Sequence, residues 1–100
     1  MKILAYDYKI KAESAPVEKL AFMGRHNGGD LNITICTGMP RQNQESTMIH
    51  EIIEAINWQL KVNLREQQII CLEIGLYNVL RNAGVDLRPL MVELKEGDGK

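Results

Sequence analysis

The sequence has no cluster of basic residues, and this excludes one large class of function. Twelve Lys and Arg residues are balanced by thirteen Asp and Glu residues, which leaves a net charge of −1. Proteins that bind a nucleic-acid backbone need clustered positive charge to neutralise the phosphates. The composition therefore predicts a protein without a nucleic-acid partner.

Long apolar runs and cysteine pairs are also missing. No segment approaches the ~20 apolar residues that cross a bilayer. Charged residues interrupt the N-terminal MKILAYDYKIKAES, which is therefore unlike a secretory signal. The two cysteines, Cys36 and Cys71, lack the Cys-x-x-Cys spacing of metal sites, and we expect both to be reduced core residues. These features indicate a cytoplasmic protein without a membrane partner.

The periodicity of the apolar residues predicts a single α+β domain over residues 1–94. One hundred residues with 45% hydrophobic content suffice for one modest core. Alternation predicts strands, the dipeptides Asn-Gly and Gly-Gly predict a hairpin turn, and 3.6-residue periodicity predicts helices. The expected elements are a strand over 2–11, hairpin strands over 20–23 and 31–36, helices over about 41–61 and 65–82, and an edge strand within 85–94. The resulting architecture is a small antiparallel sheet packed on two helices, followed by a disordered tail over 95–100.

Each predicted helix has an apolar stripe that we expect to face the core. In the first helix the stripe comprises Ile49, Ile52, Ile53, Ile56 and Leu60, and in the second Ile69, Leu72, Leu76 and Leu80. Pro89 limits the last predicted strand to a sheet edge, because proline cannot donate a ladder hydrogen bond.

His50 and Glu54 lie four residues apart in the first predicted helix. This spacing places both side chains on one helix face, where an imidazole nitrogen and a carboxylate oxygen can bind one metal ion. Glu51 stands where a His-Glu-x-x-His hydrolase has the general base that acts on water at the metal. The pattern His-Glu-x-x-Glu also occurs on ordinary solvated helix faces, so the motif alone leaves both interpretations open.

A third ligand would come from the second predicted helix, which offers Glu66 and Glu73. The two residues stand about 10 Å apart along the helix axis, so one ion cannot easily reach both. Glu73 interrupts the apolar stripe, and buried carboxylates are rare unless they are paired or bind a metal. Tyr77, on the same face as Glu73, is a candidate for stabilising an oxyanion. His26 is expected to be an exposed turn residue rather than a ligand.

The order of the elements and the segment ESTMIHEIIEAINWQL point to a known group of proteins. A hairpin ending in LNITI and a loop with proline precede this segment, and a second helix ending GLYNVLRNAG follows it. The pattern resembles small phage and prophage proteins of the zincin-like metallopeptidase group over roughly residues 20–84. The matching positions are Glu45, Ser46, His50, Glu51, Ile52, Glu54, Ala55 and Ile56.

The resemblance implies a minimal zincin-like fold that holds a metal ion between the two helices. His50 and Glu54 would match the first two ligands of the group, and Glu51 its catalytic base. Glu66 aligns where members of the group often carry a histidine, so the implied ligands are one nitrogen and two carboxylates. This set is less selective for zinc than a pair of histidines, and manganese, iron, calcium or no ion are also compatible with it.

Two hypotheses of function remain open at this stage. The first is a metal-dependent hydrolase that acts on a peptide or protein substrate, as the resemblance implies. The second is a binding or structural module that retains the scaffold after catalysis has been lost, which the replaced histidines favour. The sequence gives no indication of the oligomeric state.

Overall fold

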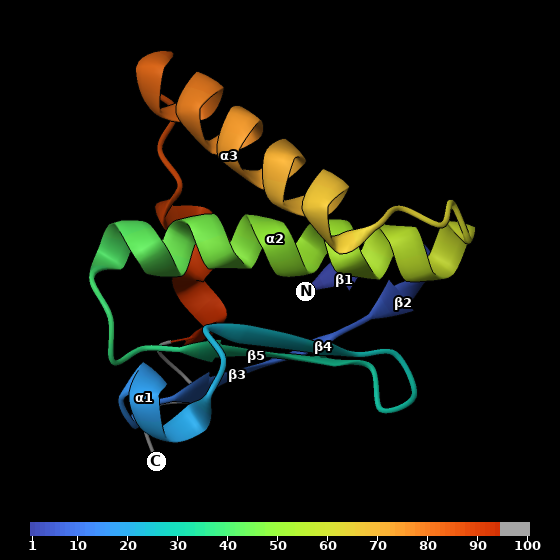
Figure 1. Cartoon of the computed structure of the whole chain (residues 1–100), viewed down its shortest axis with the longest axis horizontal. Coiled ribbons are helices and arrows are strands. Elements are labelled where there is room, and N and C mark those ends of the chain that lie inside the picture. Colours follow the sequence, from blue (N-terminus) through green and yellow to red (C-terminus); the bar gives the residue numbers. More distant parts are fainter. Residues whose placement is uncertain (95–100) are drawn as a thin grey trace.

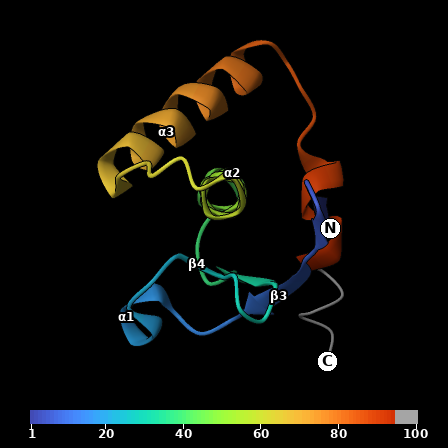
Figure 2. The same cartoon turned by 90° about the vertical axis from the view of Figure 1, so that its right-hand side faces the viewer.

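The computed structural model of the chain describes residues 1–94, and the elements are arranged around one central helix. Helix α2 has a small sheet on one side and helix α3 on another (Figures 1 and 2). The elements in chain order are β1 (Lys2–Ile3), β2 (Tyr6–Asp7), β3 (Lys9–Glu13), α1 (Val17–Leu20), β4 (Gly24–Asn27), β5 (Asn32–Cys36), α2 (Arg41–Leu60), α3 (Glu66–Asn82) and the 3-10 helix η1 (Arg88–Met91). The fold class is α+β, as predicted. The predicted tail over 95–100 lies outside the described residues.

The main sheet combines the predicted antiparallel hairpin with one parallel strand. Its order is β3-β5-β4, and β4 pairs with β5 antiparallel. Strand β3 pairs with β5 in parallel, with Ile10 opposite Ile33. Antiparallel neighbours need only a tight turn, whereas the parallel pair requires the longer connection through α1 and β4. This order leaves β4 at an edge of the sheet.

The hairpin turn lies at the predicted position, whereas the first hairpin strand begins later in the sequence than predicted. The Asn27 side chain accepts a hydrogen bond from the Asp30 N–H at 3.0 Å, which stabilises the turn. The strand before it spans Gly24–Asn27, directly next to the turn, instead of residues 20–23. All of the expected strand residues precede β4, and the first of them, Leu20, is the last residue of the short helix α1 (Val17–Leu20).

The predicted strand over 2–11 is also interrupted. Leu4 adopts a φ of 53°, outside the strand region, and β1 and β2 pair with each other as a separate antiparallel ribbon. Tyr8 and Ile10 are buried, whereas Leu4 and Tyr6, which occupy alternate positions of the same apolar pattern, are half exposed. The alternating pattern therefore holds only where the chain joins the main sheet.

The edge strand predicted within 85–94 is wrong, because the chain forms the 3-10 helix η1 there. Pro89 lies in the first turn of η1, where its missing N–H costs no hydrogen bond. Leu87, Met91 and Leu94 are buried. The apolar residues in this segment thus anchor it to the core through helical spacing rather than strand alternation.

Helix α2 contributes to two apolar clusters on different sides. Met48 and Ala55 pack with sheet residues such as Ile33, while Ile49 and Ile53 pack with Ile69 of α3. Leu60 at the end of the predicted stripe is 60% exposed. The sheet and α3 are therefore held together through α2.

Helix α3 buries a narrower face than predicted. Ile69 is buried and Leu80 packs near it, but Leu72 and Leu76 are 44% and 46% exposed. Cys71, which was expected in the core, is exposed as well, whereas Cys36 is buried as predicted. A helix that packs on only one neighbour covers only one narrow stripe, so the side chains flanking that stripe stay in contact with water.

Within residues 1–94, no helix combines the length and the apolar character needed to cross a membrane.

The substitution Ile53→Asp is expected to lower the free energy of unfolding by about 3 kcal/mol or more. Ile53 of α2 is buried in the cluster that contains Ile69 of α3. An aspartate at this position would lose the apolar contacts of isoleucine and would leave a carboxylate without solvation. Urea unfolding followed by circular dichroism measures the change. The matched control is Leu60→Asp, at an exposed position of the same helix. Equal losses of stability in the two variants would contradict this packing.

Candidate metal centre

His50 lies in the middle of α2 and is oriented toward two carboxylates. Its side chain is only 14% exposed, and its Nε2 atom lies 3.4 Å from Glu54 Oε2 and 3.3 Å from Glu66 Oε2. Two ligands at 2.0–2.2 Å from a tetrahedral ion are themselves about 3.4 Å apart. One ligand atom from each of the three residues lies within 4.8 Å of the others. The described chain thus brings together the three predicted ligands at spacings suited to one ion.

The turn between the two helices positions Glu66 as the first residue of α3. Lys61 ends α2 in the left-handed conformation, and Asn63 has a φ of 67°. The Asn57 side chain accepts a hydrogen bond from the Leu64 N–H at 2.9 Å and donates to the Leu64 carbonyl at 3.4 Å. Asn57 is one turn beyond Glu54 on α2, so the same helix face carries a candidate ligand and stabilises the turn.

Glu73 binds the other ring nitrogen of His50. Its Oε1 lies 2.8 Å from His50 Nδ1, and its Oε2 accepts a hydrogen bond from the Ser46 hydroxyl. A carboxylate in this place keeps the proton on Nδ1, which leaves the Nε2 lone pair directed at Glu54 and Glu66. The geometry therefore places Glu66 with Glu54 at His50 Nε2 and Glu73 at His50 Nδ1, a distinction that the sequence left open.

The carboxylates of the cluster repel each other in the absence of a cation. Burial raises the pKa of Glu54, and the neighbouring Glu66 raises it further. Burial lowers the pKa of His50, but the bond to Glu73 and the surrounding carboxylates outweigh this and raise the pKa overall. The contributions of neighbouring carboxylates to these two shifts reflect negative charge that a divalent cation would neutralise.

Glu51 lies beside the cluster, in a pocket of about 400 Å³. Its side chain is buried, and burial is the main reason that its pKa is raised to about 7, with Glu54, Glu66 and Glu73 adding to the effect and His50 opposing it. The pocket is lined by Met23, Gly24, Thr47, His50, Glu51, Glu66, Ile70, Glu73 and Ile74. Glu51 therefore shares a pocket with His50 and Glu66, two of the three candidate ligands.

Gly24 allows β4 to approach α2 closely at this point. A Cβ atom there would lie 2.5 Å from Thr47 Cγ2 and 2.9 Å from Glu51 Oε2. Any larger residue would displace one of these side chains. The role of Gly24 is not visible in the sequence, because no sequence signal marks the place where this strand crosses the helix.

Two further residues considered from the sequence have other partners. The Tyr77 hydroxyl donates to Glu45 Oε1 at 3.0 Å and accepts a hydrogen bond from Arg81, and Tyr77 does not line the pocket. The oxyanion role considered for Tyr77 therefore has no support in this geometry. His26 lies in β4 rather than in the turn, with Nε2 2.9 Å from the Tyr8 hydroxyl, and it is not part of the ligand group.

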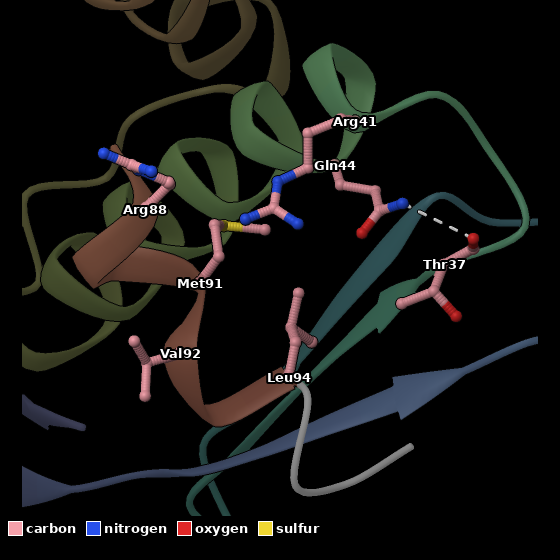
Figure 3. Close-up of a pocket in the computed structure, with 7 residues that line it drawn as sticks. All are labelled: Thr37, Arg41, Gln44, Arg88, Met91, Val92 and Leu94. Carbon is pink, nitrogen blue, oxygen red and sulfur yellow. Dashed lines mark hydrogen bonds between the residues drawn. The ribbon is translucent and has the colours of Figure 1, made fainter. Parts of the chain in front are cut away.

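A second pocket, of about 380 Å³, lies between α2 and η1 (Figure 3). It is lined by Thr37, Arg41, Gln44, Arg88, Met91, Val92 and Leu94. Arg41 Nε lies 3.6 Å from Glu45 Oε2, and Arg88 Nη2 lies 2.9 Å from Asp86 Oδ2. Both arginines thus have acidic partners, and none of the predicted site residues lines this pocket.

The substitution Glu73→Gln is expected to weaken metal binding by about 10–100-fold, the usual effect of losing an outer carboxylate partner of a histidine ligand. Glutamine keeps the shape but removes the charge that holds the proton on His50 Nδ1. Competition with a chromophoric chelator measures the affinity. Glu66→Gln is the comparison and should cost more, because it removes the charge of a ligand. A larger loss for Glu73→Gln would make Glu73 the third ligand instead.

Comparison of the chain with protein families, curated proteins and solved structures finds no match in any of the three.

Proposed function

We propose that the protein is a metal-dependent hydrolase that cleaves peptide bonds. The observation that carries the proposal is the convergence of His50, Glu54 and Glu66 next to the buried carboxyl group of Glu51. The ligand set comprises one nitrogen and two carboxylates, which suits zinc and also manganese or iron. The resemblance of the sequence to zincin-like proteins of phages and prophages supports the same assignment.

Each residue of the cluster would have a defined role. A divalent ion bound here would supply Lewis-acid activation of water and of the substrate carbonyl. Glu51 would take the proton from the attacking water and pass it to the leaving amine, and its burial, which disfavours the charged carboxylate, makes it a stronger base. Glu73 would hold His50 in the tautomer that binds metal.

The edge of the sheet offers a place for a peptide backbone. Strand β4 is the last strand in the order β3-β5-β4, and its first residue, Gly24, lines the pocket with Glu51. An extended peptide can add to such an edge through main-chain hydrogen bonds. A substrate bound in this way would pass the carboxyl group of Glu51.

Titration calorimetry of the metal-free protein with zinc and with manganese tests the proposal. Binding of one ion per chain is the expected result. Absence of binding for both ions would contradict the proposal.

The second candidate function is a non-catalytic binding module on the same scaffold. One observation favours it: among the residues lining the pocket, apart from His50, only Thr47 has a side chain that can donate a hydrogen bond when the carboxyl groups are ionised. Few side chains are thus available to stabilise an oxyanion. Metal binding without hydrolysis would support this alternative. The cytoplasmic location and the phage origin rest on the sequence alone and stay predictions.

A further inference from the structure

The pocket beside the candidate metal centre has a polar half and an apolar half. The polar half contains His50, Glu51, Glu66 and Glu73. The apolar half consists of three large side chains: Met23, just before β4, and Ile70 and Ile74 on α3. We call these three residues the apolar wall.

The apolar wall is unusually accessible for its composition. Met23, Ile70 and Ile74 are 51%, 39% and 52% exposed. Single exposed aliphatic residues are common, but three that line one pocket offer apolar area that one ligand can bury, which is favourable. Ile70 and Ile74 are four residues apart, so they share one flank of α3.

The other exposed apolar residues of α3 lie on the opposite flank. Leu72, Leu76 and Val79 are rotated away by the helical period, and none of them lines the pocket. The two flanks therefore allow a controlled comparison on one helix, in which only one flank borders the candidate site.

Charge limits what the pocket can accept. Glu51, Glu66 and Glu73 line the pocket, and the Glu54 carboxylate lies just outside it, 3.4 Å from His50 Nε2. A bound dication would neutralise only part of this charge. An acidic group entering the pocket would meet like charge, and such repulsion is an effective means of rejecting a ligand.

We propose that the apolar wall binds a large aliphatic or aromatic side chain of the peptide substrate, adjacent to the bond that is cleaved, and that acidic side chains are rejected. This inference rests on the proposed function and adds the substrate class to it. A volume of about 400 Å³ lies in the range of small-ligand sites, and is enough for one large side chain with its backbone.

The first test uses three hydroxamates on the zinc-loaded protein. N-acetyl-leucine, N-acetyl-glycine and N-acetyl-aspartate hydroxamates share the metal-binding group and differ only in the side chain. We expect the leucyl compound to bind about tenfold or more tightly than the glycyl compound, from burial of the isobutyl group. The aspartyl compound should bind more weakly than both.

Two variants locate the preference. Ile74→Arg should remove the leucyl advantage and improve binding of the aspartyl compound, whereas Val79→Arg, on the opposite flank, should change neither. Both positions are exposed, so both variants should fold. Equal affinity for the three hydroxamates, or equal effects of the two variants, would overturn the inference and leave the metal site intact.

A second readout does not require a metal. N-acetyl-leucine methylamide is titrated at millimolar concentration into the metal-free protein while the methyl resonances of Ile70 and Ile74 are recorded. Saturating shifts at these methyl groups, with none from N-acetyl-aspartate methylamide, support the apolar wall even if zinc does not bind and the proposed hydrolase fails. Absence of such shifts with the leucyl probe overturns the inference whatever the metal result.

Discussion

The substitution His50→Ala is expected to weaken metal binding by more than about 100-fold, because loss of an outer partner of a ligand alone costs 10–100-fold. His50 Nε2 is the only nitrogen in the ligand group, which otherwise consists of the carboxylates Glu54 and Glu66. Without the imidazole, two carboxylates on neighbouring helices remain, one of them 64% exposed. Such a pair retains only the weak cation affinity of adjacent acidic residues.

The control for this experiment is His26→Ala. His26 is the other histidine of the chain and lies in β4 against the Tyr8 hydroxyl. Calorimetry with zinc should give wild-type affinity for this variant, and circular dichroism should show both variants folded. If His50→Ala and the wild type bind zinc equally, the cluster is an ion-paired helix interface, and the binding-module alternative stands alone.

The helical pattern of the sequence was sufficient to predict that His50 and Glu54 lie together and face the second helix. His50 and Glu54 face α3 because they flank the buried residues Ile49 and Ile53, and a period of 3.6 residues determines which neighbours share a face. The pattern left Glu66 and Glu73 open as partners from the second helix, and only the resemblance to the zincin-like group favoured Glu66. Local periodicity thus predicts which residues can meet across two sequential helices.

The role of Glu73 could not be predicted in the same way. Its distance from Glu66 along α3 shows that the two carboxylates cannot easily bind one ion, but not which of them reaches it. That depends on the crossing of α2 and α3, which places Glu73 against His50 Nδ1 and Ser46. The helix crossing also explains why Leu72 and Leu76 are exposed. Their apolar character predicted a wider contact between α2 and α3 than the two helices make.

The burial of Glu51 also depends on tertiary structure. Its neighbour Gly24 lies far away in the sequence and belongs to a strand whose position was predicted a few residues too early. The same kind of error affected residues 85–94, where proline and spaced apolar residues suit a strand as well as the 3-10 helix that forms. Patterns of a few residues do not distinguish these alternatives.

The substitution Glu51→Gln is expected to reduce any hydrolytic activity by a factor on the order of 10²–10⁴, the usual contribution of a positioned general base. Glutamine has nearly the same size and fits the space beside Gly24, but it cannot accept a proton from water. Metal affinity should stay close to that of the wild type, because Glu51 is not one of the three grouped ligands. Hydrolysis of fluorescein-labelled casein by the zinc-loaded protein measures the activity.

The matched control is Glu45→Gln, which makes the same change at another buried glutamate of α2. Glu45 bonds Tyr77 and pairs with Arg41 and Arg81, and it does not line the pocket. This variant should lose some stability and keep its activity per folded molecule. Equal activity of Glu51→Gln and the wild type would rule out Glu51 as the base. If the zinc-loaded wild type binds the metal yet cleaves nothing, the geometry of the site serves binding rather than catalysis.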